Sequence, residues 1–205
     1  MPPTTPTSPG ASAPAARSNP SEDLRAVATE LFASAGYAGT SLQQIADAAG
    51  YSKSSVLYHF ASKEALLDAV LGPAIDRLES VLVTVADLAG TPRERAQFVE
   101  RFIDFLFDYR LEVHTFINQG QSLIDIPVID RANATVSTLA ESFSTDFTSV
   151  EEKVRFGVAL GGAAYTLVAG ANFAESELPL AEVRRALVAT VSDLLTPVRP
   201  HRSSR

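Results

Sequence analysis

The chain has 205 residues, of which 46% are hydrophobic, and it carries a net charge of −7 without a single cysteine. This apolar content is enough for a sizeable core, so we expect a folded protein of one or two domains. The lack of cysteine excludes disulfide bonds, thiolate metal sites and cysteine nucleophiles, and it favours a cytoplasmic location.

Both ends of the chain have the composition of flexible tails. Six of the twelve prolines lie in the first twenty residues, among Thr, Ser, Ala and Gly. Such a segment has little to bury, and it lacks the apolar core of a secretory signal. We predict a disordered N-terminal tail over residues 1–18 and a flexible basic tail over residues 198–205.

The first predicted helix begins at Pro20, where Asn19 supplies an N-cap and the proline occupies the first helical position. Apolar residues then recur at intervals of three and four from Leu24 to Ala35, and Gly36 offers a left-handed end. This spacing predicts an amphipathic helix.

Two short helices are predicted next. Thr40 is expected to cap the second helix, with Gln43 reaching back to its start. After a glycine turn, Ser52 is expected to cap a third helix whose inner face carries Val56 and Phe60. Two short helices joined by a tight glycine turn predict a helix-turn-helix.

The rest of the chain is also predicted to be helical. A long helix from Lys63 to Leu88 is expected to kink or break at Gly72 and Pro73, because Pro73 cannot donate to the carbonyl of Ala69. This point is either a hinge or a passive kink. Further helices are predicted at residues 92–110, 112–123, 128–142, 150–173 and 180–195. No segment alternates like a strand, so the predicted fold class is all-α.

One run of sequence resembles a known family. The segment from Leu31 to Leu66, LFASAGYAGTSLQQIADAAGYSKSSVLYHFASKEAL, is similar to the DNA-binding segment of TetR-family transcriptional regulators. By motif the resemblance covers residues 21–68, and beyond them helix number, length and order agree with the family. It implies an N-terminal helix-turn-helix DNA-binding domain over residues 19–65 and a C-terminal helical ligand-binding and dimerisation domain over residues 66–197.

The resemblance also implies partners and contacts. A homodimer would bind double-stranded operator DNA and respond to a small-molecule effector, with no cofactor, and its third helix would enter the major groove. The DNA contacts implied are Thr40, Gln44, Lys53, Ser54, Ser55, Tyr58, His59 and Lys63. Leu57 stands where the family often has a phosphate-binding tyrosine, so Tyr58 is expected to take over that contact. Two of these contacts have alternatives without DNA. The ring of His59 could pack on Phe60, and Lys63 could belong only to the charged first turn of its helix.

The charge of the motif argues against unspecific DNA binding. Residues 21–68 carry three cations and six carboxylates, a net charge of −3. Any DNA contact must then use a few placed cations, amides at helix N-termini and hydroxyl groups. The acidic charge keeps a second function open, a helical adaptor whose motif binds protein. An enzyme is not expected, because the three histidines form no nucleophile–base pair or metal set.

An uncharged stretch of nineteen residues, 156–174, is long enough for a membrane span. Its many glycines and alanines, and the lack of an aromatic belt, instead favour a buried helix without membrane contact. The resemblance assigns it, with residues 180–195, to a four-helix bundle between two subunits. The residues predicted to contact an effector are Phe102, Phe105, Phe116, Asn118, Gln121, Tyr165 and Asn172.

Overall fold

The computed structural model describes residues 19–83, 91–144, 149–173 and 179–196, so both predicted tails lie outside the described residues. Every regular element in these ranges is helical, which confirms the predicted fold class. The elements are α1 (Pro20–Ala35), α2 (Leu42–Ala49), α3 (Lys53–His59), α4 (Lys63–Val83), α5 (Pro92–Asp108), α6 (Arg110–Gln119), the short 3-10 helix η1 (Gly120–Leu123), α7 (Pro127–Ser144), α8 (Val150–Phe173) and α9 (Leu180–Leu194).

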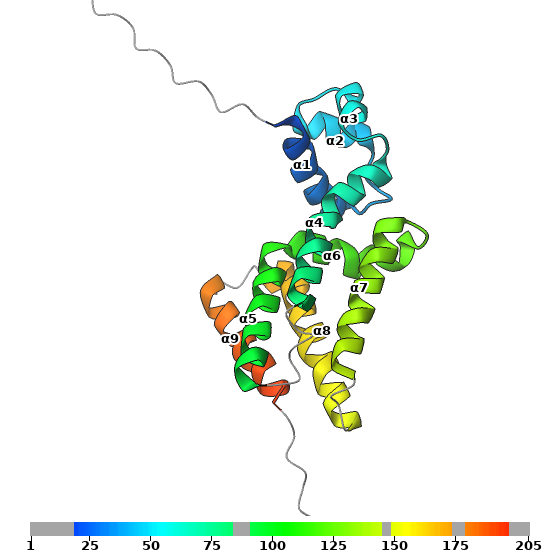
Figure 1. Cartoon of the computed structure of the whole chain (residues 1–205). Helices are drawn as coiled ribbons and strands as arrows, with labels where there is room; N and C mark the ends of the chain where they lie inside the picture. Colours follow the sequence, from blue (N-terminus) through cyan, green and yellow to red (C-terminus); the bar gives the residue numbers. More distant parts are fainter. Residues whose placement is uncertain (1–18, 84–90, 145–148, 174–178, 197–205) are drawn as a thin grey trace, which may run out of the picture.

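Helices α1 to α3 form a small N-terminal domain above the body of the protein, and α4 leads from one into the other (Figure 1). The first half of α4 packs into the same core as α1 to α3. Phe32, Ile45 and Val56 are fully buried in it, and Phe60 is 8% exposed. The predicted inward face of the third helix is therefore confirmed.

The start of α2 differs from the prediction by one residue. Ser41 is the N-cap: its hydroxyl accepts from the amide of Gln44, and the Gln44 side chain accepts from the amide of Ser41. Thr40 is buried, and its hydroxyl donates to the carbonyls of Leu31 and Gly36. Both hydroxyls stand three residues before a glutamine, so the sequence pattern suits either. Packing against the end of α1 decides between them.

This capping arrangement makes a prediction about stability. Ser41→Ala should lower the free energy of unfolding by about 1 kcal/mol, because the amide of Gln44 loses its acceptor. Gln43→Ala, at an exposed site in the same turn, should change it by less than about 0.5 kcal/mol. Urea denaturation of both variants measures the difference. Equal losses would contradict the assignment of the cap.

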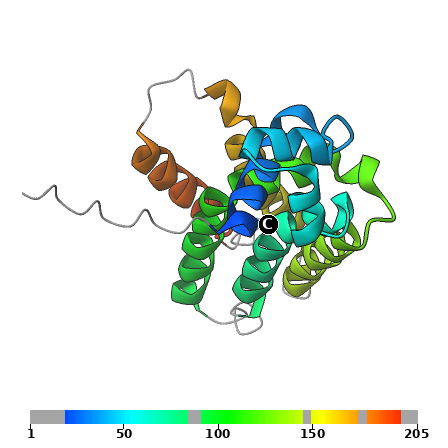
Figure 2. The ribbon, with the colours of Figure 1, turned by 90° about the horizontal axis from the view of Figure 1, so that it is seen from above.

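In the body, α4 lies between α5 and α7, with α8 and α9 packed behind them (Figure 2). Helix α4 is continuous through Gly72 and Pro73, so the break predicted there as the alternative to a kink is absent. A second apolar core joins the second half of α4 to α5, α8 and α9. No helix within the described ranges is long and apolar enough to cross a membrane.

Candidate nucleic-acid interface and ligand cavity

The connection between α2 and α3 is built from three residues. Gly50 adopts the left-handed conformation, with φ 74° and ψ 24°, which glycine accepts without strain. The amide of Tyr51 donates to the carbonyl of Ala46 at 2.8 Å, and Ser52 caps α3 by accepting from the amide of Ser55 at 3.1 Å. These bonds turn the chain sharply, so α3 begins directly after α2.

The outer face of α3 is polar and open to solvent. Lys53 and Ser54 are exposed, and Tyr58 is 85% exposed. Ser55 is half-buried. The structure therefore brings Lys53, Ser54 and Tyr58 together on the face that the sequence predicted to contact DNA.

His59 closes this face and packs on its neighbours. Its half-buried ring stands edge-on to Tyr58, with ring centroids 5.1 Å apart, and 6.5 Å from the ring of Phe60. These contacts favour the packed alternative for His59, with Tyr58 as the group that projects.

Two of the other predicted DNA contacts are already engaged within the domain. Thr40 is 3% exposed and gives its hydroxyl to two backbone carbonyls, so its side chain is not available to a phosphate, and this prediction is corrected. Gln44 is exposed at the start of α2, where its carbonyl oxygen completes the cap.

Lys63 lies against the aromatic ring of Tyr37. Its Nζ is 4.1 Å from the ring centroid, a cation–π contact that holds the ammonium at the domain surface. Burial lowers the pKa of Lys63, while the charge of Glu64 opposes the shift. Burial, with a smaller effect from Glu64, raises the pKa of Tyr37 to about 12, so this ring stays neutral and Lys63 keeps its aromatic partner.

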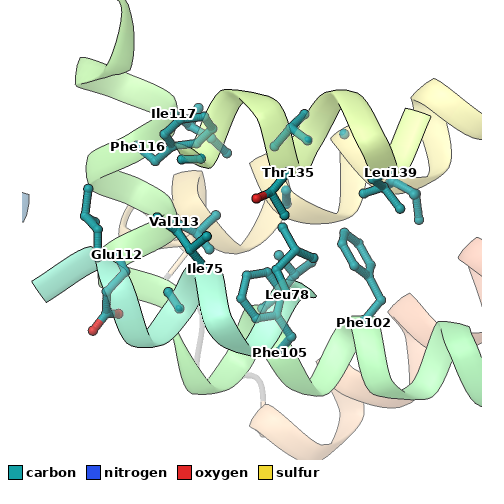
Figure 3. A pocket seen from close by; sticks show the side chains of 18 residues that line it. Ile75, Leu78, Phe102, Phe105, Glu112, Val113, Phe116, Ile117, Thr135 and Leu139 are labelled. Carbon is teal, nitrogen blue, oxygen red and sulfur yellow. The ribbon is translucent and has the colours of Figure 1, made fainter. Parts of the chain in front are cut away.

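A cavity of about 250 Å³ lies in the body, among α4 to α8 (Figure 3). Its walls are almost entirely apolar. They comprise Leu71, Ala74, Ile75, Leu78, Phe102, Phe105, Leu106, Glu112, Val113, Phe116, Ile117, Ala132, Thr135, Val136, Leu139, Leu160, Gly161 and Ala164.

The predicted ligand contacts divide into two groups. The aromatic ones, Phe102, Phe105 and Phe116, line the cavity. The polar ones do not: Asn118, Gln121 and Tyr165 are exposed, and the side chain of Asn172 lies outside the described part of the chain. Those three exposed residues are therefore corrected as wall residues. The rotation of α6 and α8 about their axes turns Asn118 and Tyr165 toward solvent, and Gln121 lies in η1, beyond the end of α6.

The polar residues that do line the cavity are Glu112 and Thr135, neither of which is among the predicted ligand contacts. Helical spacing is the signal that points to them, because Glu112 stands four residues before Phe116 and Thr135 four residues before Leu139. Burial raises the pKa of Glu112, and the nearby charge of Arg25 on α1 opposes this shift. Glu112 is thus a half-buried acid between the cavity and the N-terminal domain.

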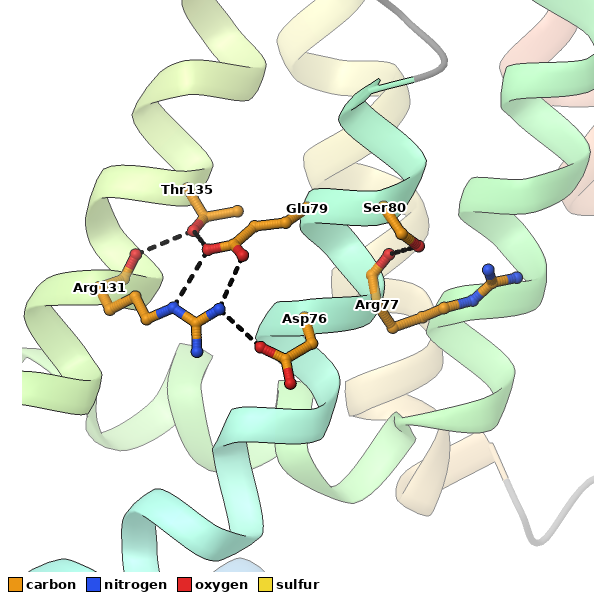
Figure 4. Close-up of polar contacts among 6 residues, drawn as sticks. All are labelled: Asp76, Arg77, Glu79, Ser80, Arg131 and Thr135. Carbon is orange, nitrogen blue, oxygen red and sulfur yellow. Dashed lines mark hydrogen bonds and ion pairs between the residues drawn. The ribbon is translucent and has the colours of Figure 1, made fainter.

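Thr135 belongs to a polar network that joins α4 to α7 (Figure 4). Arg131 pairs with Asp76 at 2.6 Å and with Glu79 at 2.7 Å, and Thr135 donates to Glu79 at 3.2 Å. The hydrogen bonds to Glu79 and then to Asp76 raise the pKa of Arg131, so its charge is permanent. The network braces two walls of the cavity, although its half-exposed pairs contribute little to stability.

Helix α3 is short and exposed, and the turn at Gly50 holds it against α2. This arrangement is a helix-turn-helix, a motif of DNA-binding proteins. Residues 24–70 match the family model described as "Bacterial regulatory proteins, tetR family". The N-terminal domain therefore contains the DNA-binding segment that is typical of TetR-family transcriptional regulators.

Part of the chain is also similar to curated transcriptional regulators. The chain is 31% identical over 107 residues to the HTH-type transcriptional repressor KstR2 of Mycobacterium tuberculosis, an alignment that covers 51% of this chain and 53% of that protein. It is 47% identical over 53 residues to the HTH-type transcriptional regulator RutR of Escherichia coli, which covers 26% of this chain and 25% of RutR. The chain therefore spans about half, or less, of the length of these relatives.

Solved structures share the fold over most of the chain. The ketosteroid transcriptional regulator KstR2 of Mycobacterium tuberculosis superposes with a TM-score of 0.67 at 21% identity, covering 85% of this chain and 94% of that one. A TetR-family regulator from Bordetella parapertussis gives a TM-score of 0.65 at 21% identity, covering 87% and 95%. The two-domain helical architecture is thus shared with these structures.

Proposed function

We propose that the chain is a homodimeric transcriptional repressor that binds operator DNA through α3 and is released from it by a small molecule. The observation that carries the proposal is the exposed face of α3, where Lys53, Ser54 and Tyr58 stand together over a fully buried Val56. A lysine and a hydroxyl can reach phosphates or base edges in the major groove. Because DNA is the proposed partner, the proposed place of action is the cytoplasm of a bacterium.

A stripe of exposed apolar residues on α8 supports the dimer. Val150, Val154, Val158 and Tyr165 are 78%, 58%, 57% and 62% exposed, and their spacing places them on one face of the helix. The bare surface of Gly161 on the same side allows another helix to approach closely. A second copy of this chain would bury the stripe and would set two α3 helices about 34–36 Å apart, one turn of DNA.

The cavity supports release by a ligand. Its apolar walls suit a mainly apolar molecule, and it lies among the helices that carry the N-terminal domain. A ligand that prefers a conformer with a different spacing of the two α3 helices weakens DNA binding by the same coupling free energy, typically about 1–3 kcal/mol. We propose repression without ligand, because the domain is already folded to bind DNA.

Selection from random duplexes tests the proposal. The purified chain should enrich a near-palindromic DNA site, and its affinity for that site should fall steeply with salt, with a log–log slope near −0.9 for each phosphate neutralised. Enrichment of no sequence, or binding that does not change with salt, would overturn it.

The rival function is a protein-binding adaptor, and the net charge of −3 over residues 21–68 is the observation in its favour. The same selection separates the two functions. An adaptor would enrich no duplex, whereas a regulator should enrich one despite its acidic domain, because contacts with the groove are local.

A further inference from the structure

The side chain of Gln119, the last residue of α6, reaches from the body into the N-terminal domain. Its Oε1 accepts a hydrogen bond from the amide of Tyr37, and its Nε2 donates to the carbonyl of Phe32 at 2.7 Å. The planar amide of Gln119 thus bonds both to the carbonyl of Phe32, in the last turn of α1, and to the amide of Tyr37, just beyond that turn. Carbonyls of the last helical turn have no partner further along their own helix, so Gln119 completes the end of α1 from another domain.

The backbone around this contact is shaped to receive it. Gly36 has a φ of 80°, which turns the chain after α1 and directs the amide of Tyr37 toward Gln119. A Cβ at Gly36 would lie 3.5 Å from Oε1, so the glutamine amide rests against bare backbone. The glutamine amide is therefore in van der Waals contact with the backbone that it bonds to.

The domains also share apolar contacts. Leu123 of η1 and Ile129 of α7 pack into the same apolar core as Phe32 and Leu67. Apolar packing is not directional, so it restricts the angle between two elements less strictly than hydrogen bonds do. Two hydrogen bonds from one rigid amide have fixed directions, and they define the angle at which α1 meets α6.

The same helix forms part of the cavity. Val113 and Phe116 line it, and Phe116 lies one turn before Gln119 on α6. In Figure 1, α6 lies at the junction of the N-terminal domain and the body, directly below α1. A shift of α6 at the cavity wall would therefore be passed to the end of α1.

We propose that Gln119 is a positioning residue: its amide sets the orientation of the N-terminal domain on the body, and hence the spacing of the two α3 helices in a dimer. This proposal rests on the proposed function for its consequence in DNA binding. It predicts that loss of the amide affects the reading of two half-sites together, and leaves the reading of one half-site intact.

The first test compares Gln119→Ala with Asn118→Ala. Asn118 is exposed, and its side chain donates to the carbonyl of His114 within its own helix, so it is a matched control. The DNA probes are the duplex selected by the unchanged protein, versions with one or two base pairs inserted between the half-sites, and a single half-site.

Gln119→Ala should bind the selected duplex about tenfold more weakly, because the two α3 helices are no longer held at the spacing of the half-sites. Its preference for the selected spacing should shrink, and its affinity for the half-site should stay unchanged. Asn118→Ala should behave like the unchanged protein. An unaltered spacing preference in Gln119→Ala, or equal losses on the full site and the half-site, would overturn the proposal.

A second measurement works without DNA. Because the chain has no cysteine, spin labels can be placed only at Ala48→Cys on α2 and Ser137→Cys on α7, both exposed. Labelled chains are diluted with unlabelled ones, so that each distance is measured within one subunit. Gln119→Ala should broaden the distance distribution, and Asn118→Ala should not. An unchanged distribution would refute the positioning role, whereas a failed DNA selection with a broadened distribution would refute only the proposed function.

Discussion

The double variant Lys53→Ala, Tyr58→Ala should bind the selected duplex about a hundredfold more weakly than the unchanged protein. The estimate takes one contact of at least about 1.4 kcal/mol for each side chain, within the range of 1–3 kcal/mol measured for single contacts in DNA grooves. Both residues are exposed, so the free energy of unfolding should change by less than about 0.5 kcal/mol. Fluorescence anisotropy at several salt concentrations measures the affinity.

The single variants separate the roles of the two residues. If Lys53 contacts a phosphate, its removal weakens binding to all sequences alike and reduces the salt slope by about 1. If Tyr58 contacts base edges, its removal relaxes the sequence preference. Arg185→Ala, which removes an exposed cation on α9, is the charge-matched control and should keep full affinity. Unchanged binding by the double variant would contradict the assignment of α3 as the recognition helix.

The second large effect is expected at the exposed stripe of α8. Val154→Glu with Val158→Glu should give a monomer, because a dimer across this face would bury two carboxylates from each subunit against one another. The mass in sedimentation equilibrium should fall to the 21.8 kDa of one chain. Affinity for the selected duplex should fall by a hundredfold or more, as expected when two linked half-sites are separated.

The fold of the single chain should survive this change, since both valines are more than half exposed. The control variant Ala96→Glu with Gln97→Glu places the same two charges on exposed positions of α5 and should remain a dimer. A dimer that persists in the α8 variant would place the subunit interface elsewhere on the body.

The N-terminal domain was predictable in most of its parts. The N-cap at Asn19, the left-handed Gly50, the cap at Ser52 and the buried Val56 all follow from patterns within five residues along the chain. Each of these patterns describes a local contact, so the chain around it holds the information. The aromatic walls of the cavity were predicted from the concentration of aromatic residues between Phe98 and Phe116.

The predictions that were wrong concern choices between equivalent residues. Thr40 and Ser41 both suit a cap, and the position of α1 excludes Thr40 by burying it. Asn118 is an amide and therefore suits a ligand contact by residue type, but it does not line the cavity. Glu112 does line it, and it stands one helical turn before Phe116, on the same face of α6. The rotation of a helix about its axis is set by all its neighbours together, and these come from distant parts of the chain.

The amino-acid sequence by itself determined that this chain is all-helical, where most helices begin and end, and which face of the third helix is left open. These properties can be predicted because caps, turns and the spacing of apolar residues depend on contacts within a few residues of the chain. The tertiary structure alone decided which polar groups enter the cavity and how the two domains are joined. The hydrogen bond from Gln119 to Phe32 spans 87 positions of the chain, and no local pattern records such a contact.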